Sequence, residues 1–487
     1  MRISVYRSPI RFCPDFKRVI LRFHGYGPDR SKSIIKKVYD MSEEDASAAL
    51  NQTLREFAKR HRNISGIFGK HYREIRHLLK EFKIDEKEIS EKRKLLIGSY
   101  FTMEYSIESA AFFNPSIMEA PDQTDLEEGQ KRVIVSFRAV GEGHISSIVF
   151  RTGLIHSDNS LHFRSAGTRI GQAGIIKHRI YDKEEFIRLL GEMQVSKKTS
   201  ELVMQELKAN FVYDDLIEAV DEVVRINQLS GETRNELKEI VWLADSHHEM
   251  NFSWDTDISE RVIFPVSTAE QKGIEDARFV RFEDDDGSVA YYATYTAYDG
   301  YTIMPKMIRT KDFYRFTTRP LRGEGAQNKN LALFPKKING KYVMMSRIDG
   351  VNSYIMFSDS ISVWENPIKL QEPKYPWEYV QIGNCGSPLE TSRGWLLITH
   401  GVGPMRRYCL GASLLDLDDP GKELGRLKEP LLIPNKEERE GYVPNVVYSC
   451  GAIIHNEEVI IPYAMSDYSS SFITVPLESL LDKILEA

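Results

Sequence analysis

RFVRFEDDDGSVAYYATYTAY, residues 278–298, contains two runs of apolar, β-branched and aromatic residues around the dipeptide Asp286-Gly287. A turn that contains Gly or Asn between two such runs predicts a β-hairpin. Two other stretches have the same pattern, LALFPKKINGKYVMMSRI at 331–348 and AIIHNEEVIIPYAM at 452–465. The sequence therefore predicts a mainly β fold.

Strand-like runs continue over most of the chain from about residue 111 to the end. Further runs are RVIVSF at 132–137, SSIVFRTGLI at 146–155, GWLLITHGV at 394–402 and SFITVPL at 471–477. The strand–turn–strand units recur roughly every 50–65 residues, as expected for a β-propeller whose units each present a loop to a common cavity. A β-sandwich with long loops is the alternative.

Two zones are predicted to be helical, residues 42–95 and residues 183–247. In the first, Ser42 and Asp45 resemble a helix N-cap, and apolar residues recur at helical spacing from Leu50 to Phe57. The second has a similar stripe that begins at Phe186. Both zones are expected to be packing or interface elements, and a homo-oligomer formed through them is one possibility. A separate apolar alternation at residues 19–23 predicts a strand near the N-terminus.

Composition and charge argue against several classes of protein. The 487 residues carry a formal net charge of −6, without the basic blocks typical of nucleic-acid-binding proteins. Four scattered cysteines do not suggest a disulfide framework or a zinc site. We see neither an apolar signal segment nor a membrane-spanning run. We therefore expect a cytoplasmic protein with no nucleic-acid or membrane partner, no metal and no cofactor.

Polar residues cluster at the ends of the predicted strands. Glu275 and Asp276 come directly before a strand, and Arg278 could hold one of the two carboxylates in place. A carboxylic acid that protonates a leaving oxygen needs such support. A solvated turn is the alternative.

A second cluster is cationic. Lys329 and Arg347 lie at opposite ends of one predicted hairpin and could face the same cavity. Two cations there would suit an anion such as phosphate, or a carboxylate. Ordinary surface cations are the alternative.

Two more clusters lie towards the C-terminus. Glu390 precedes the apolar strand that ends in His400, and the alternative is a plain turn with a buried histidine. Tyr463, Asp467 and Tyr468 close the last β unit, and an aspartate between tyrosines suits sugar recognition. A structural turn is equally compatible with this pattern.

Seven segments, in order, resemble glycoside hydrolase family 130, a family of five-bladed propellers that contains β-mannoside phosphorylases and β-mannosidases. The segments are FNPSI at 113–117, SFRAVGEGHISSI at 136–148, GIEDARFVRF at 273–282, NKNLALFPKKINGKYVMMSR at 328–347, SPLETSRGWLLITHGV at 387–402, VPNVVYSCGAI at 443–453 and YAMSD at 463–467. The similarity covers about residues 100–487 and the opening strand near 7–22.

The resemblance implies a five-bladed β-propeller with additional α-helical segments. The expected divisions are an opening propeller strand at 1–22, a helical insertion at 23–98, a first blade region at 99–181, a second helical insertion at 182–250 and the remaining blades with the catalytic cavity at 251–487.

The resemblance also implies roles for individual residues. Asp276 matches the family's general acid, which in the phosphorylases acts through a sugar hydroxyl. Substrate-binding positions are expected at Asn114, Arg138, Glu275, Arg278, His400, Tyr463 and Asp467. The cations that hold phosphate in the phosphorylases match Lys329 and Arg347.

Glu390 departs from the family pattern, because it occupies a position where the phosphorylases usually have a lysine. An anion there would repel phosphate and could activate water. We therefore predict an inverting β-mannosidase, acting on β-1,2-linked manno-oligosaccharides, with Asp276 as acid and Glu390 as base about 6.5–9.5 Å apart. One alternative is an inverting phosphorylase with inorganic phosphate as co-substrate, held by Lys329 and Arg347 with help from Arg406 or Arg407. Another is a non-catalytic sugar-binding propeller.

Overall fold

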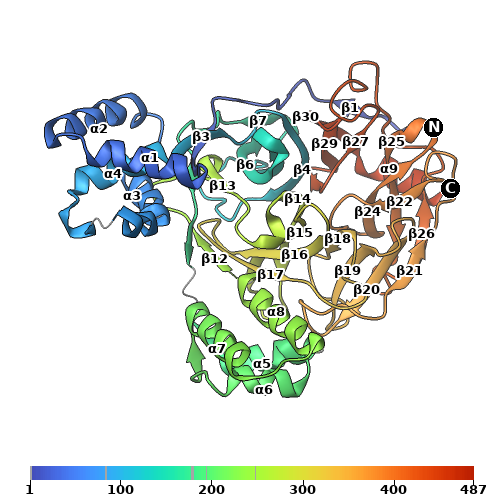
Figure 1. Cartoon of the computed structure of the whole chain (residues 1–487). Helices are drawn as coiled ribbons and strands as arrows, with labels where there is room; N and C mark the ends of the chain where they lie inside the picture. The colour runs from blue at the N-terminus through green and yellow to red at the C-terminus, as the bar shows by residue number, and fades with distance from the viewer. Residues whose placement is uncertain (1–2, 83–84, 177–179, 194, 247, 487) are drawn as a thin grey trace.

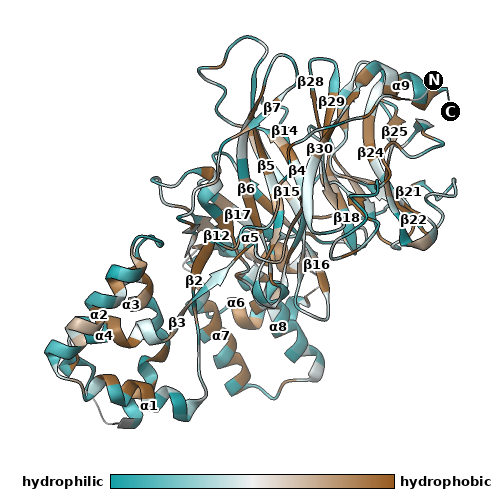
Figure 2. Ribbon diagram, turned by 90° about the horizontal axis from the view of Figure 1, so that it is seen from above, coloured by the Kyte–Doolittle hydropathy of each residue, from teal (hydrophilic) through white to brown (hydrophobic). Residues whose placement is uncertain are grey.

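The computed structural model describes residues 3–82, 85–176, 180–193, 195–246 and 248–486. The prediction of a mainly β fold is confirmed, and most strands pair antiparallel with their neighbours in sequence (Figure 1). Hydrophobic residues follow the strands and hydrophilic residues follow the connecting loops (Figure 2). The core thus lies within and between the sheets, which fits the alternating patterns in the sequence.

The largest sheet contains two antiparallel meanders of four strands each. The first meander consists of β4 (Ala111–Glu119), β5 (Lys131–Val140), β6 (Ser146–Ile155) and β7 (Leu161–Phe163). The second consists of β14 (Gly273–Glu283), β15 (Val289–Tyr298), β16 (Ile303–Thr310) and β17 (Arg315–Pro320). A single parallel pair, Gly273 with Ser146, joins them. Four short strands complete the sheet: β8 (Gly171–Gln172), β9 (Gly174–Ile176), β12 (His248–Asn251) and β13 (Arg261–Ile263).

Three further sheets follow in chain order. One contains β18 (Lys329–Leu333), β19 (Tyr342–Arg347), β20 (Ser353–Ser358) and β21 (Ile368–Gln371). The next contains β22 (Gln381–Asn384), β23 (Leu389–Thr391), β24 (Gly394–Val402), β25 (Tyr408–Leu415) and β26 (Glu423–Arg426). The last contains β27 (Val447–Tyr448), β28 (Ile453–His455), β29 (Glu458–Met465), β30 (Ser469–Pro476) and, from the other end of the chain, β1 (Tyr6–Arg7).

The N-terminal region supplies two strands to different sheets. β1 pairs with β30, so both ends of the chain meet in one sheet (Figure 1). The apolar run at 19–23 forms the predicted strand, β2 (Val19–Phe23), which pairs with β3 (Thr102–Ser106) in a separate two-stranded sheet.

Four helices between β2 and β3 form a unit with its own hydrophobic core. They are α1 (Pro28–Tyr39), α2 (Glu43–Phe57), α3 (Ile64–Ile75) and α4 (Glu91–Tyr100). Ser42 caps α2 as predicted, because its hydroxyl accepts a hydrogen bond of 3.0 Å from the Asp45 backbone N–H. Arg62 joins the unit to the β region through ion pairs with Asp255 and Glu260.

Four more helices lie between β9 and β12 and have a second separate core. They are α5 (Lys183–Glu192), α6 (Lys197–Met204), α7 (Tyr213–Ile226) and α8 (Gly231–Ser246), accompanied by the antiparallel strand pair β10 (Tyr181–Asp182) and β11 (Asn210–Phe211). Arg322, which follows β17, donates a hydrogen bond of 2.7 Å to the Leu189 carbonyl of α5. A last helix, α9 (Leu477–Leu485), packs on the core of the C-terminal sheets.

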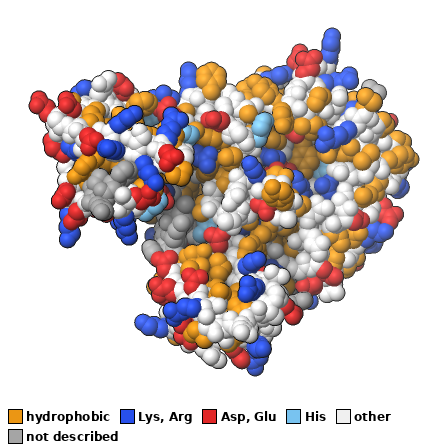
Figure 3. All heavy atoms as spheres, viewed as in Figure 1, with side chains coloured by type: hydrophobic (Ala, Val, Ile, Leu, Met, Phe, Trp, Pro, Cys, Tyr) orange, Lys and Arg blue, Asp and Glu red, His pale blue; other side chains and the backbone are white. Residues whose placement is uncertain are grey.

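Acidic and basic side chains are interspersed over the face of the molecule in Figure 3. Within the described ranges, no helix combines the length and apolarity needed to cross a bilayer.

Candidate active site

A pocket of about 190 Å³, which we call the Asp276 pocket, lies where the first strands of several antiparallel units begin. β14 contacts both β4 and β18, and β18 contacts β22, so the early residues of these strands converge. The lining consists of Asn114, Arg138, Asp276, Lys329, Asn330, Arg347, Gln381, His400, Arg406, Tyr408, Val443, Val446, Tyr448 and Asp467.

In three of the units, a strand that pairs with the first strand returns to the same pocket. Arg138 pairs with Phe113, Arg347 pairs with Lys329, and His400 pairs with Gly383. The structure thus brings together seven of the predicted site residues: Asn114, Arg138, Asp276, Lys329, Arg347, His400 and Asp467.

Three of the first strands are distorted where they line the pocket. Asn114, Asp276 and Asn330 have left-handed φ values of 49°, 53° and 71°. Each lies within a register shift of its strand, in β4, β14 and β18 respectively. Such irregularities redirect a side chain out of the regular pleat, and each non-glycine residue in this conformation costs on the order of 1–3 kcal/mol. Their convergence on one pocket indicates a functional site.

Asp276 is held from two sides. Asn114 Nδ2 donates a hydrogen bond of 2.7 Å to Asp276 Oδ1, and Arg138 Nη1 lies 3.4 Å from the same oxygen. Burial alone would raise the pKa of Asp276, but the charges of Arg138, Arg278 and Lys329 outweigh it, and the pKa lies below its ordinary value. The free pocket therefore stabilises the carboxylate form of Asp276.

Asp467, in the turn between β29 and β30, is the second carboxyl group of the pocket. Burial and the neighbouring charge of Asp276 raise the pKa of Asp467 to about 6. The two aspartates are thus perturbed in opposite directions.

Two predicted residues lie behind the lining and support it. Glu275 accepts hydrogen bonds of 2.8 Å from Arg138 and 2.7 Å from Lys329, which fixes both cations. Arg278 donates a hydrogen bond of 3.0 Å to the Asp276 carbonyl and another of 2.7 Å to the Tyr448 hydroxyl. We infer that these two residues position the lining groups.

Arg347 is a buried cation with an incomplete set of partners. Its Nη1 interacts with His400 Nε2 at 3.4 Å, and its Nε has no hydrogen-bond partner among the residues that the structure describes. Burial lowers the pKa of Arg347, and burial together with the charge of Arg347 lowers the pKa of His400 well below its ordinary value. His400 is therefore neutral, and the guanidinium of Arg347 has capacity to bind an anion.

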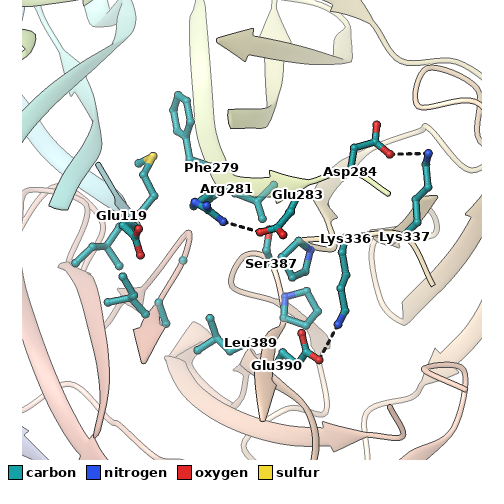
Figure 4. A pocket seen from close by; sticks show the side chains of 18 of the residues that line it. Glu119, Phe279, Arg281, Glu283, Asp284, Lys336, Lys337, Ser387, Leu389 and Glu390 are labelled. Atoms are coloured by element: carbon teal, nitrogen blue, oxygen red, sulfur yellow. Dashed lines mark hydrogen bonds and ion pairs between the residues drawn. The ribbon is translucent and has the colours of Figure 1, made fainter. Parts of the chain in front are cut away.

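Glu390 does not line the Asp276 pocket. It lines a different cavity of about 550 Å³, which we call the Glu390 pocket, and its Oε1 lies 2.7 Å from Lys336 Nζ (Figure 4). The Glu390 side chain is 48% exposed. The prediction that Glu390 acts as a base opposite Asp276 is contradicted by this placement.

The two pockets lie at opposite ends of the same strands. β14 contributes Asp276 to the first pocket and Glu283 to the second, and these residues are seven positions apart, or roughly 23 Å along a strand. Likewise, Glu390 pairs with Trp395 at the start of β24, whereas His400 lies five residues further along it. Strand length therefore separates Glu390 from the predicted sugar site.

Tyr463 is also placed elsewhere. It is buried in the hydrophobic core of the C-terminal sheets, and its hydroxyl donates a hydrogen bond of 2.6 Å to Glu438. The prediction that Tyr463 contacts substrate is contradicted, because its side chain is enclosed in this core.

Several lining residues were not assigned a role from the sequence, namely Asn330, Gln381, Tyr408, Val443, Val446 and Tyr448. Asn330 and Tyr448 are joined by a hydrogen bond of 3.0 Å. Asn330 and Gln381 are polar residues at the start of a strand. The same feature of the sequence pointed to Asp276 as a site residue. In the described ranges, no group of three or more His, Cys, Asp or Glu side chains is arranged to hold a metal ion.

Comparison with known proteins identifies the class. Residues 229–486, more than half of the chain, match the family model of glycoside hydrolase family 130, described as beta-1,4-mannooligosaccharide phosphorylase. The chain belongs to this family.

Two relatives come from bacteria and match part of the chain. One is a 1,2-beta-oligomannan phosphorylase of Thermoanaerobacter sp. (strain X514), 38% identical over 210 residues, which are 41% of this chain. The other is a beta-1,2-mannobiose phosphorylase of Listeria innocua serovar 6a, 30% identical over 252 residues, which are 49% of this chain. The chain spans 66% of the length of each relative. A solved structure of the beta-1,2-mannobiose phosphorylase from Listeria innocua has a TM-score of 0.47 and 20% identity, covering 79% of this chain and 94% of that chain.

Proposed function

We propose that this chain is an inverting β-mannoside phosphorylase that cleaves β-1,2-linked manno-oligosaccharides with inorganic phosphate and releases mannose 1-phosphate. The names of the two bacterial relatives support the substrate class. This proposal replaces hydrolysis as our first interpretation, because the base assigned to hydrolysis, Glu390, lies in the other pocket.

The observation that carries the proposal is the charge of the Asp276 pocket. Four cations line it, Arg138, Lys329, Arg347 and Arg406, against the two carboxylates of Asp276 and Asp467. Glu275 and Arg278, behind the lining, offset one another in charge. Among the described residues, these groups leave an excess of two positive charges at the pocket, which favours an anionic ligand, and a phosphate dianion would neutralise it.

Phosphate would act as the nucleophile of the reaction, and its negative charge would also change the pKa of Asp276. An oxygen of phosphate forms a bond to C1 of the terminal mannosyl unit, on the face opposite the leaving group, while the glycosidic C1–O bond breaks. The departing oxygen takes the proton that Asp276 carries, passed on through a sugar hydroxyl, and Asp276 is left as a carboxylate. A dianion next to Arg347 and Lys329 would also weaken their hold on the Asp276 carboxylate, so we expect bound phosphate to raise the pKa of Asp276 towards that of a working acid.

The family's five-bladed propeller supplies a frame for this site. We propose that the five antiparallel units, with first strands β4, β14, β18, β22 and β27, are its blades. The pairing of β1 with β30 supports closure, because it joins the two ends of the chain in one sheet.

Inverting hydrolysis remains the second candidate, and Asp467 is the specific reason. With a pKa of about 6 this carboxyl is mostly ionised at pH 7, and it shares the pocket with Asp276. A carboxylate at a suitable distance on the opposite face of the sugar could activate water.

The test incubates the protein with β-1,2-mannobiose, with and without inorganic phosphate. We expect mannose and mannose 1-phosphate in equal amounts, and only when phosphate is present. Free mannose formed equally fast without phosphate would support hydrolysis instead. Absence of turnover on any β-mannoside, combined with sugar binding that survives Asp276→Asn, would favour a non-catalytic sugar-binding protein.

A further inference from the structure

Exposed side chains form a rim next to the Asp276 pocket. Tyr442, Met405 and Tyr468 are 67%, 88% and 44% exposed. Each directly adjoins in sequence a residue that lines the pocket: Val443, Arg406 and Asp467 respectively. Since consecutive Cα atoms are about 3.8 Å apart, the backbone of these three exposed residues lies at the border of the pocket.

His144 adds a ring to this rim. Its ring centroid lies 5.5 Å from that of Tyr442, with an interplanar angle of 30°. His144 belongs to the loop between β5 and β6, only six residues after Arg138, which lines the pocket. The Val443 N–H donates a hydrogen bond of 3.0 Å to the Ser466 carbonyl, which joins the Tyr442 segment to the turn of Asp467. We call His144, Met405, Tyr442 and Tyr468 the rim.

Backbone geometry presents two rim residues to solvent. His144 and Met405 have left-handed φ values of 59° and 61°. This conformation is uncommon for residues other than glycine, above all for a methionine, and strain of this kind concentrates at binding sites.

We propose that the rim binds the mannosyl units of an oligosaccharide that extend beyond the Asp276 pocket, and that it makes the enzyme prefer chains of three or more units. The inference rests on the proposed function, which places the terminal linkage in the pocket. A pocket of about 190 Å³ holds only the end of such a chain, and the rest must pass over the rim. Aromatic rings pack on the apolar faces of pyranoses, and the tyrosine hydroxyls and the imidazole of His144 can hydrogen-bond to sugar hydroxyls.

The distribution of charge favours a sugar chain over a second protein surface. The loops that carry the rim also expose Glu142, Arg407 and Glu440 among the apolar side chains. The central part of a protein–protein interface is depleted in charged residues, and large docking surfaces are contiguous apolar patches. Separate rings with polar tips, set among polar groups, fit a ligand that has both apolar faces and hydroxyl groups, as a sugar chain does.

The test compares kcat/KM for β-1,2-mannobiose, mannotriose and mannotetraose. We expect the tetraose-to-biose ratio to be above one in the wild type and to fall roughly two- to tenfold in Tyr442→Ala, the range expected for an aromatic packing contact. Tyr442→Phe keeps the ring and should preserve the ratio. Tyr6→Ala removes a tyrosine of similar exposure, 60%, on β1 and serves as the control. Met405→Ala tests a second rim position.

A ratio that is unchanged in both Tyr442→Ala and Met405→Ala would overturn the proposal. A binding measurement separates this outcome from failure of the proposed function. In Asp276→Asn, calorimetry should show tighter binding of mannotriose than of mannobiose, with the difference reduced by a further Tyr442→Ala. If the protein instead hydrolyses the substrates, the proposed phosphorylase activity is contradicted. The tetraose-to-biose ratio of kcat/KM can still be measured in that case and still tests the rim. If Tyr442→Ala instead dissociates an oligomer in sedimentation and leaves the ratio unchanged, the rim binds a second copy of the chain and the proposal is wrong.

Discussion

The carboxyl groups of Asp276 and Asp467 share one pocket, and the charge of Asp276 contributes to raising the pKa of Asp467 to about 6. The pKa of Asp276 is lowered, because cations and Asn114 outweigh its burial. Opposite shifts in neighbouring acids are a mark of sites that handle protons. Substitutions at these acids, at the cations and at Glu390 separate the roles of the three groups.

Asp276→Asn should reduce kcat for β-1,2-mannobiose by roughly 10²–10⁴, the range for loss of a positioned acid. Asparagine preserves the shape of the side chain, so the melting temperature and the circular dichroism should show a folded protein. Asp284→Asn in the Glu390 pocket removes a carboxylate that pairs with Lys337 and serves as a control for activity. Retention of more than a tenth of the wild-type kcat in Asp276→Asn would exclude it as the acid.

Asp467 should make the protein less stable as the pH rises. Its folded pKa of about 6 lies above the ordinary aspartate value of about 3.9, so the folded state binds the proton more tightly between these two pH values. Stability contributed by this group is present below about pH 4 and is lost as the pH rises through about 6. The melting temperature of Asp467→Asn should therefore match that of the wild type at pH 4 and exceed it at pH 7.5.

Asp284 provides the control, because its pKa is shifted in the opposite direction from that of Asp467. Lys337 lowers the pKa of Asp284, so removing this carboxylate should not stabilise the protein at pH 7.5. A melting-temperature difference between Asp467→Asn and the wild type that does not change with pH would contradict the raised pKa.

Glu390→Gln should keep activity within about twofold of the wild type. The ion pair with Lys336 is solvent-exposed, and such pairs contribute only about 0.2–1 kcal/mol to stability. Steady-state kinetics and chemical denaturation test both expectations. A loss of a hundredfold in kcat would show that Glu390 takes part in the chemistry despite its place at the far end of the strands.

Arg347→Met should raise KM for phosphate by roughly 10- to 150-fold, since a hydrogen bond to a charged group is worth about 1.5–3 kcal/mol. The same change should leave the melting temperature equal or higher, because it removes a buried cation whose Nε has no partner in the described part of the chain. Arg347→Lys retains the charge and should restore part of the phosphate affinity.

Arg281→Met is the matched control for Arg347→Met. Arg281 lines the Glu390 pocket and pairs with Glu283 at 3.2 Å, so its loss should not change KM for phosphate. An unchanged KM for phosphate in Arg347→Met would remove this residue from the anion site.

Much of the site could be predicted because its residues occupy equivalent places in repeated hairpins. Asn114, Asp276 and Lys329 precede or begin apolar runs, and Arg138, Arg347 and His400 end the returning strands. Local pattern and family resemblance together therefore pointed to one end of the sheets. The left-handed backbone of Asp276 and Asn114 could not be foreseen, because it depends on register shifts between strands.

The error over Glu390 has a geometric cause. Glu390 and His400 were assigned to one site, although the strand of residues 394–402 separates them. Glu390 pairs with Trp395, and five residues of strand between Trp395 and His400 span about 17 Å. Reading the segment as a hairpin would have placed Glu390 at the far end. The prediction that Tyr463 contacts substrate was wrong for a different reason. The sequence does not reveal which face of β29 is enclosed in the core.

The helical units were predictable as elements but not in their placement. Periodicity and the Ser42 cap located helices such as α2. The separate cores of the two units, and the pairing of β2 with β3, depend on contacts distant in sequence.

The most direct test follows the oxygen that becomes attached to C1 of the cleaved mannosyl unit. The reaction is run with β-1,2-mannobiose and phosphate in ¹⁸O-labelled water and analysed by mass spectrometry and NMR. We predict α-mannose 1-phosphate whose C1 oxygen comes from phosphate and carries no label. Free α-mannose with ¹⁸O at C1 as the main product would show that water is the nucleophile and would contradict the assignment of the cationic pocket to phosphate.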